Sequence, residues 1–374
     1  MFHVVSCIIA LYVIWRLVLP LPISKTIRAV LAVTILLGAE HQLITRNFFG
    51  SMASPEIPFA WLVFLSCLYG AICFTGLLLM FKDVISALLY LPAKKASKAV
   101  WVSLPLSVAI AASATMLALI GVWQAVRVPD VKKIEIVLKN LPSQLDGFRV
   151  VQLTDLHASR LLQAPWMDAV VTKANALQPD LMVITGDLVD GTPEARDADV
   201  QPLRKLQARQ GVYAIPGNHE YYADYTSWLE AFNQLGLPML LNQSVTITHN
   251  GASFVLAGVT DTIAPNFQET PPDLAAALED APVDQPIILL AHRPIDAQAN
   301  AEAGVALQLS GHTHGGQILG FHKVVQWANQ GFVSGLYQVD DMQLYVSNGT
   351  GLWAGLPIRL GRPSEITEIT LRAN

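Results

Sequence analysis

The sequence predicts an α/β protein in two parts, a transmembrane region followed by a water-soluble domain, and three observations lead to this class. Of 374 residues, 52% are hydrophobic and only 14% are charged, and the mean hydropathy of +0.42 exceeds that of an ordinary soluble enzyme. Residues 1–126 hold eight basic and three acidic side chains, so their net charge is +5, whereas residues 127–374 carry −10. From about residue 131, long apolar runs give way to short strand-like runs that alternate with amphipathic helical stretches.

Four apolar segments are candidate transmembrane helices, at residues 4–21, 27–43, 59–81 and 100–126. The third and fourth contain no charged residue and exceed the ~20 residues needed to cross a bilayer core of ~30 Å. The first contains Arg16 near its end, and the second ends at Glu40 and His41. These two side chains could mark an intramembrane site, but their place at a span end favours interfacial anchoring. No Lys or Arg precedes the first apolar core, so a cleaved signal peptide is not expected.

Basic residues between the segments predict which side of the membrane each loop occupies. The loops on the more basic side hold Lys25 and Arg28 between the first two segments, and Lys82, Lys94, Lys95 and Lys98 between the last two. The middle loop has only Arg46. The positive-inside rule then predicts a multi-pass protein of the inner or plasma membrane, with its amino terminus and carboxyl-terminal domain outside the cytoplasm. The basic residues Arg127, Lys132 and Lys133 after the last segment oppose this orientation.

The charge of the soluble domain argues against nucleic acid as a partner, and the positions of the cysteines exclude disulfides and thiolate metal sites from that domain. Binding a nucleic-acid backbone requires clustered Lys and Arg, so a domain with a net charge of −10 is not expected to bind nucleic acid. Cys7, Cys67 and Cys73 all lie in the apolar region. The soluble domain therefore has neither a disulfide nor a thiolate metal ligand, and cysteine usage does not identify the compartment.

The soluble domain is expected to be built around buried sheet. The candidate strands are residues 148–153, 181–185, 212–215, 254–259, 287–290, 307–310 and 344–347. The candidate helices are residues 161–177, 200–209 and 225–235. Short apolar runs that alternate with helices in this way are typical of an α/β domain.

Five of these strands are followed directly by Asp, His or Asn, at the position where sites assemble in open α/β sheets. The five segments are TDLH (154–157), GDLVD (186–190), PGNHE (216–220), AHRP (291–294) and GHTHGGQ (311–317). Side chains at i and i+2 of extended backbone project to the same side, so Asp155 with His157, and His312 with His314, can each present two ligands to one place.

The donor types favour a borderline divalent metal. Taken singly, the first four segments are more often a turn, a helix cap or a buried histidine, whereas GHTHG is as often a metal site as not. The ordered set at five strand ends favours metal. Carboxylate, imidazole and amide oxygen together suit Mn²⁺, Fe²⁺ or Zn²⁺ more than Ca²⁺. We expect Mn²⁺, with Fe²⁺, Zn²⁺ or Mg²⁺ as alternatives. Seven candidate ligands exceed the needs of one ion and suit two ions that share a bridging carboxylate.

The five segments, in this order, resemble those of the calcineurin-like metallophosphoesterase superfamily, from about Gly147 to the carboxyl terminus. The tail SNGTG (347–351) followed by LPIRLGRP (356–363) is similar to the bacterial membrane-anchored branch, which commonly has a basic residue where Asn348 stands. The resemblance implies a two-sheet β-sandwich flanked by helices. The expected organisation is a transmembrane region at 1–126, a linker and first strand at 127–146, and the metallophosphoesterase domain at 147–374.

The resemblance also implies a role for each site residue. It places Asp155, His157 and His314 on a first metal, Asn218, His292 and His312 on a second, and Asp187 between the two. His219 would not bind metal; it would face the phosphate, stabilising the transition state or protonating the leaving oxygen. Arg359 and Arg362 could bind substrate phosphate, because guanidinium forks suit phosphate oxygens, or could equally be solvated surface arginines. His249 and His322 fit no segment and are expected at the surface.

The expected function is a membrane-anchored phosphohydrolase that acts on a phosphodiester or pyrophosphate. Two ions ~3.5–4 Å apart can hold a hydroxide between them for in-line attack on phosphorus while neutralising the phosphoryl oxygens. The membrane bilayer is an expected partner, and the substrate is a phosphorylated small molecule or lipid. One alternative is a pyrophosphatase of the UDP-2,3-diacylglucosamine type in lipid A synthesis, which needs a cytoplasmic active site. Others are a catalytically silent membrane scaffold and a regulated transporter, against which the scarcity of intramembrane charges argues.

Overall fold

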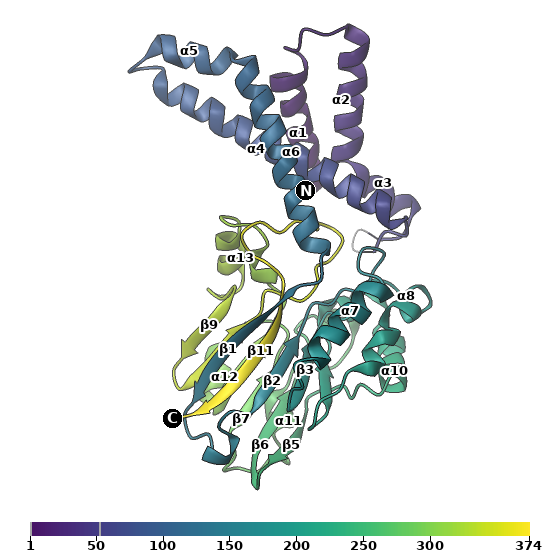
Figure 1. Cartoon of the computed structure of the whole chain (residues 1–374), viewed down its shortest axis with the longest axis vertical. Helices are drawn as coiled ribbons and strands as arrows, with labels where there is room; N and C mark the ends of the chain where they lie inside the picture. The colour runs from purple at the N-terminus through teal and green to yellow at the C-terminus, as the bar shows by residue number, and fades with distance from the viewer. Residues whose placement is uncertain (1, 52–53) are drawn as a thin grey trace. The chain divides into compact units, whose positions relative to one another are not determined.

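The computed structural model describes residues 2–51 and 54–374 (Figure 1). The chain divides into two compact units. The helical unit comprises Met1–Gln124 together with Ala354–Ile358, and the sheet unit comprises Ala125–Trp353 together with Arg359–Asn374. Five residues close to the carboxyl terminus are therefore part of the helical unit.

The helical unit contains two helices that are long and apolar enough to cross a membrane. Its elements are α1 (Phe2–Val13), the π-helical turn η1 (Ile14–Val18), α2 (Lys25–Ala39), α3 (His41–Phe48), α4 (Phe59–Leu89), α5 (Lys94–Val102) and α6 (Leu104–Val126). The candidate spans are α4, with 31 residues, and α6, with 23. The bent pair α2 and α3 would be a third span if counted as one, and His3–Val18 is a shorter apolar helix. The expectation of four spans is therefore supported for its last two members and unconfirmed for its first two.

Local features explain where these helices depart from the expected ranges. The second segment is not one straight helix, because the backbone leaves helical geometry at Glu40 and the two halves are bent by 56°. Helix α4 continues past residue 81 as far as Leu89, and Asp83 within this extension forms an ion pair with Arg16 at 2.6 Å. Helix α6 begins at Leu104 rather than at residue 100, because the ring of Pro105 is incompatible with a preceding helical turn.

The sheet unit contains two mixed sheets. In sheet order, the first consists of β1 (Asp130–Leu138), β11 (Glu365–Ala373), β2 (Arg149–Leu153), β3 (Leu181–Thr185) and β4 (Val212–Ile215). The second consists of β5 (Gln243–His249), β6 (Ala252–Gly258), β7 (Ile287–Leu290), β8 (Val305–Ser310), β10 (Met342–Val346) and β9 (Gly335–Val339). Strands β2, β3 and β4 are mutually parallel, as are β6, β7, β8 and β10. Parallel strands bring their carboxyl ends to one edge of each sheet.

The two sheets pack face to face, and helices cover their outer faces. One buried cluster joins Val150 and Leu181 of the first sheet to Leu256 and Leu309 of the second. The outer face of the first sheet packs against α7 (Ala164–Asn175), α8 (Pro193–Val200) and α10 (Tyr225–Gln234), and Figure 1 shows these helices beside β3. The short helices α11 (Leu274–Ala277) and α12 (Ala297–Glu302) pack on the second. The expected two-sheet α/β sandwich is confirmed.

Most expected elements of the sheet unit are present, and the differences have local causes. Residues 181–185, 212–215 and 287–290 are strands over the expected ranges. The expected helix at 200–209 is wrong: α8 ends at Val200, and a short 3-10 helix containing Pro202 follows. The candidate strands omitted β5, β9 and β11, in which polar residues interrupt the apolar ones, so none of them forms a continuous apolar run.

Candidate metal centre

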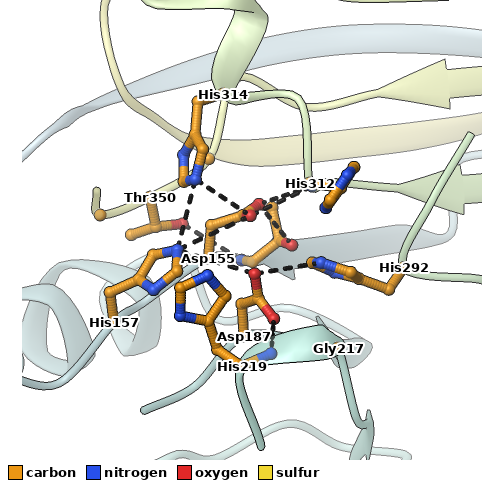
Figure 2. Close-up of polar contacts among 12 residues, drawn as sticks. Asp155, His157, Asp187, Gly217, His219, His292, His312, His314 and Thr350 are labelled. Carbon is orange, nitrogen blue, oxygen red and sulfur yellow. Dashed lines mark hydrogen bonds and ion pairs between the residues drawn. The ribbon is translucent and has the colours of Figure 1, made fainter. Parts of the chain in front are cut away.

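The loops that follow strands of both sheets meet at one place and bring the expected ligands together (Figure 2). Asp155 and His157 follow β2, Asp187 follows β3, and His292 follows β7. Backbone hydrogen bonds join the first two loops, from Asp155 to the carbonyl of Gly186 at 2.9 Å and from His157 to that of Asp187 at 3.0 Å. The other expected ligands, Asn218, His312 and His314, come from the loops after β4 and β8.

Asp155, His157 and His314 form the first group of candidate ligands, and their ligand atoms all lie within 4.8 Å of one another. The Nε2 atoms of His157 and His314 face each other at 3.3 Å, as Figure 2 shows. The Nε2 atom of His314 lies 3.6 Å from Oδ1 of Asp155. Two imidazole nitrogens at this separation repel each other unless a proton or a cation lies between them, so the geometry suits a metal ion.

Asp187, His292 and His312 form the second group. The Oδ2 atom of Asp187 lies 3.1 Å from Nε2 of His292, whose Nδ1 bonds the carbonyl of Thr185 at 2.8 Å. That bond orients the ring and leaves Nε2 aimed at the carboxylate. The Oδ1 atom of Asn218 is buried and has no hydrogen-bonding partner in the described part of the chain. Burying an amide oxygen without a hydrogen bond is energetically unfavourable unless the oxygen binds a ligand.

The backbone at the metal centre is strained. Five of the seven expected ligands have positive φ angles, between 48° and 67°. They are Asp155, His157, Asp187, His312 and His314. Non-glycine residues in this region cost about 1–3 kcal/mol each and persist where the surrounding structure holds them. Strain concentrated in this way is typical of a functional site.

Two glycines allow the loops to approach each other this closely. A Cβ atom at Gly217 would collide with the carboxylate of Asp187 and lie 2.6 Å from its backbone nitrogen. A Cβ atom at Gly311 would collide with the side chains of Thr154 and Asp155. Any larger residue at either position would push an acidic ligand out of place.

The electrostatics of the group also fit a metal. Burial and the neighbouring His292 hold the pKa of His312 well below its usual value, and burial and His157 do the same for His314. Both rings are therefore neutral near pH 7, and a neutral ring is the form that binds metal. Although burial opposes ionisation, the positive charge of His292 holds the pKa of Asp187 well below its ordinary range, so this carboxylate is charged.

Comparison with known proteins agrees with this geometry. Residues 148–316 match the family model for calcineurin-like phosphoesterases. An uncharacterized metallophosphoesterase of Bacillus subtilis is 34% identical over 243 residues, which cover 62% of this chain and 82% of that protein. The chain belongs to the calcineurin-like metallophosphoesterase family.

Other members of the family are longer than the matched region. A transmembrane protein with a metallophosphoesterase domain from Bos taurus is 38% identical over 271 residues, or 69% of this chain. An uncharacterized metallophosphoesterase of Helicobacter pylori is 38% identical over 253 residues, or 67% of this chain. The matched regions cover 61% of the first relative and 66% of the second, so this chain matches less than two thirds of the length of either protein.

In this metallophosphoesterase, His219 is held by a carboxylate that the expected site did not include. The Nδ1 atom of His219 lies 2.5 Å from Oδ1 of Asp190, and the Nδ1 atom of His157 lies 3.2 Å from Oδ2 of the same side chain. Burial favours a neutral ring, but the charges of Asp190 and Asp187 raise the pKa of His219 to about 9. The ring is therefore protonated near neutral pH. The second Asp of GDLVD was the available signal in the sequence.

Glu220 is a second functional residue that sequence reasoning missed. Its buried carboxylate accepts hydrogen bonds from the backbone nitrogens of Gly217 at 2.7 Å, Leu188 at 2.6 Å, and Asp187 at 3.2 Å, with a longer one from Val189. These bonds join the loop after β3 to the loop after β4. Glu220 thereby positions Asp187, although it does not face the metal centre itself.

Arg359, expected to bind substrate or to be solvated, is buried. Its guanidinium donates to the backbone carbonyls of His314 at 3.0 Å, Asn348 at 2.7 Å and Gly351 at 2.9 Å. It thus joins the loop of a metal ligand to the loop after β10. Arg362 is half-buried, and its backbone carbonyl accepts a bond from Arg359.

The two histidines expected at the surface differ from each other. His249 is half-buried and packs its ring edge-on against Phe148. His322 is buried, and its Nδ1 accepts a hydrogen bond from the backbone of Gly320 at 2.9 Å. The expectation of a surface position is therefore wrong for His322, because it begins α13 (His322–Ala328), which packs against the loop of His314.

Proposed function

We propose that this protein is a membrane-anchored, two-metal phosphohydrolase that cleaves phosphodiester or pyrophosphate bonds. The observation that carries the proposal is the pair of ligand groups, Asp155 with His157 and His314, and Asp187 with His292 and His312. Asp187 also forms a third group with His157 and His219, and its Oδ2 lies 3.8 Å from Nε2 of His157, so its carboxylate is within reach of both ligand groups. This arrangement supports two metal positions that share Asp187, with Asn218 completing the second.

Two divalent ions bound there would lower the pKa of a coordinated water and neutralise the phosphoryl oxygens. The ligand residues hold and orient these ions, and the protein's own acid is His219. Because Asp190 accepts from Nδ1 of His219, the other ring nitrogen is free to donate a proton to the leaving oxygen. The negative charge of Asp190 beside the ring favours its protonated form.

Arg293 supports a substrate with a second phosphoryl group or another negative group. Its Nε donates to both carboxylate oxygens of Asp261, at 3.1 and 3.0 Å, and its terminal nitrogens have no hydrogen-bonding partner among the described residues. Both side chains line a cavity of about 100 Å³ beside His292. A guanidinium held there suits the second phosphate of a pyrophosphate.

The helical unit supports action at a membrane surface. Segment 354–358 packs within that unit: the side-chain amide of Gln42 donates to the carbonyl of Gly355, and a Cβ at Gly70 would lie 2.7 Å from Cδ1 of Ile358. Trp353, which precedes this segment, belongs to the sheet unit and lies with its ring 6.4 Å from that of His219. The loop that carries Trp353, next to the proposed acid His219, therefore continues directly into a segment of the helical unit.

We further propose, from the distribution of lysines, that the catalytic domain is extracytoplasmic. A reporter enzyme that folds only outside the cytoplasm, fused after Asn374, should be active, whereas a reporter active only in the cytoplasm should be silent. The opposite pattern would refute this orientation and would favour the pyrophosphatase of lipid A synthesis, whose UDP-sugar substrate is cytoplasmic.

The hydrolase proposal is tested with the full-length protein purified in a neutral detergent. Treatment with EDTA should abolish hydrolysis of bis-p-nitrophenyl phosphate, and Mn²⁺, Zn²⁺ or Mg²⁺ should restore it, with Mn²⁺ expected to be the most effective. Asp187→Ala should lose bound metal and nearly all activity, while His219→Ala should keep metal and turn over slowly. The exposed Asp168→Ala serves as the matched control. Wild-type metal content and turnover in Asp187→Ala would refute the proposal, and inactivity of the wild type with every metal and ester would favour a silent scaffold.

A further inference from the structure

A cavity of about 520 Å³ lies in the helical unit where α4 is followed by α5. We call it the lysine–tryptophan pocket. Its lining consists chiefly of Lys94, Lys98, Tyr90, Trp101, Ser86 and Ser97. None of these residues takes part in the metal centre, so the pocket is a separate feature of the molecule.

The walls of the pocket are fixed by hydrogen bonds between helices. The hydroxyl of Ser86 on α4 donates to the carbonyl of Ser97 on α5 at 2.9 Å. The guanidinium of Arg16 lies 4.0 Å from the centre of the Trp101 ring and donates to the backbone carbonyl of the same residue at 3.0 Å. Asp83 in turn holds Arg16 through two bonds of 2.7 and 2.6 Å. The cavity is therefore already formed before any ligand binds.

Positive charge accumulates at the pocket without a balancing carboxylate. Lys94, Lys95 and Lys98 all lie on α5, and none of them forms an ion pair with an acid among the described residues. Asp83 is the sole acid in the sequence between Ile57 and Pro129, and Arg16 and Tyr12 already bond to it.

The position of these lysines on the helix adds to the positive potential. Lys94 and Lys95 occupy the first turn of α5, which has no side-chain cap. The amino-terminal end of a helix carries a partial positive charge, so cations there are unfavourable. A bound anion would offset both the charges of the lysines and the partial positive charge of the helix end.

We propose that the lysine–tryptophan pocket binds the headgroup of an anionic phospholipid. Tyr and Trp beside basic residues are typical of the membrane–water interface, and basic pockets between membrane helices bind acidic headgroups. Apolar side chains next to the pocket are exposed, including Leu88 at 72% and Leu91 at 91%. These would contact the acyl chains, which a soluble anion lacks.

The chain order places the pocket at one end of α6. That helix begins at Leu104, directly after α5, and its 23 residues are long enough to cross a bilayer core. The chain enters the sheet unit from the opposite end of the helix, near Val126. We therefore expect the bound lipid to stabilise the helical unit and not to be the substrate of the metal centre.

The test measures the thermal midpoint of the full-length protein in neutral detergent, with four additions at equal phosphorus concentration. These are phosphatidylglycerol, cardiolipin, phosphatidylcholine and inorganic phosphate. The anionic lipids should raise the midpoint, whereas phosphatidylcholine and inorganic phosphate should leave it unchanged. A rise of equal size with phosphatidylcholine or with inorganic phosphate would overturn the proposal.

Matched variants locate the effect in the pocket. Lys94→Gln with Lys98→Gln should bind phosphatidylglycerol roughly thirtyfold more weakly, the equivalent of about 1 kcal/mol for each lysine near a charged surface. Lys25→Gln with Lys95→Gln removes the same charge outside the pocket lining and should bind as the wild type does. Ala87→Trp keeps the charge but fills the cavity, because this exposed residue lines it, and should also lose the lipid effect. Equal weakening in the two double variants would overturn the assignment to this pocket.

Discussion

The contact between Asp190 and His219 leads to a sharp prediction for Asp190→Asn. One carboxylate oxygen lies 2.5 Å from Nδ1 of His219 and the other 3.2 Å from Nδ1 of His157, so the side chain serves the proposed acid and a proposed metal ligand together. The asparagine keeps the shape and removes the charge. We therefore expect two separate defects, one in turnover and one in metal affinity.

The size of each defect follows from the structure. The pKa of His219 is raised from the ordinary 6.5 to about 9, which corresponds to roughly 3 kcal/mol of stabilisation for the protonated ring. Loss of a positioned acid lowers kcat by about 10²–10⁴-fold, and loss of the carboxylate that orients a ligand histidine weakens metal binding by about 10–100-fold. Asp190→Asn should show both effects, and His219→Ala only the first.

The assay is a double-mutant cycle. The kcat for bis-p-nitrophenyl phosphate is measured at saturating Mn²⁺ for both single variants and for the double variant, and metal affinity is measured separately by calorimetry. Because the two residues act as one unit, the double variant should be about as slow as His219→Ala alone. Asp197→Asn, an exposed acid of the nearby α8, is the matched control. If the two kcat penalties multiply in the double variant, Asp190 does not act through His219 and the reasoning is refuted.

Three further predictions concern residues around the centre. Glu220→Ala leaves four buried backbone N–H groups without an acceptor and should lower the free energy of unfolding by roughly 3–5 kcal/mol, seen as a lower thermal midpoint; an unchanged midpoint would contradict its positioning role. Arg359→Lys should lower the thermal midpoint and leave KM unchanged, because the carbonyl bonds are lost; a raised KM at full stability would instead indicate a substrate contact. Arg293→Gln should lower kcat/KM for a pyrophosphate substrate about tenfold relative to bis-p-nitrophenyl phosphate, the equivalent of one charge-assisted hydrogen bond, and an unchanged ratio would remove it from substrate binding.

Much of the site could be predicted because its information is local in the sequence. Each ligand directly follows a short apolar strand, and a strand of continuous apolar residues is recognisable without knowledge of its neighbours. Asp155 and His157, like His312 and His314, lie two residues apart. The edge strands β5 and β9 could not be found in this way, because polar residues interrupt their apolar ones and each forms only by pairing with a neighbouring strand of the sheet.

The residues that were missed or left open depend on contacts between distant segments. Asp190 becomes a partner of His219 only when the loops after β3 and β4 are brought together, across 29 positions of the chain. Arg359 could be either a substrate contact or a solvated residue from its sequence alone. Its burial among the carbonyls of two loops follows from the packing of β8 and β10.

The sequence by itself determined the two long apolar helices, the buried strands and the set of carboxylate, imidazole and amide donors, because each of these is written in the order of a few neighbouring residues. Only the tertiary structure decided that the donors converge in two groups sharing Asp187, that Asp190 and Glu220 support them, and that lysines on α5 line a cavity with Trp101. The physical reason is that the energies of these arrangements come from contacts across the two sheets and between helices. No local pattern specifies which distant partner a buried charge will find.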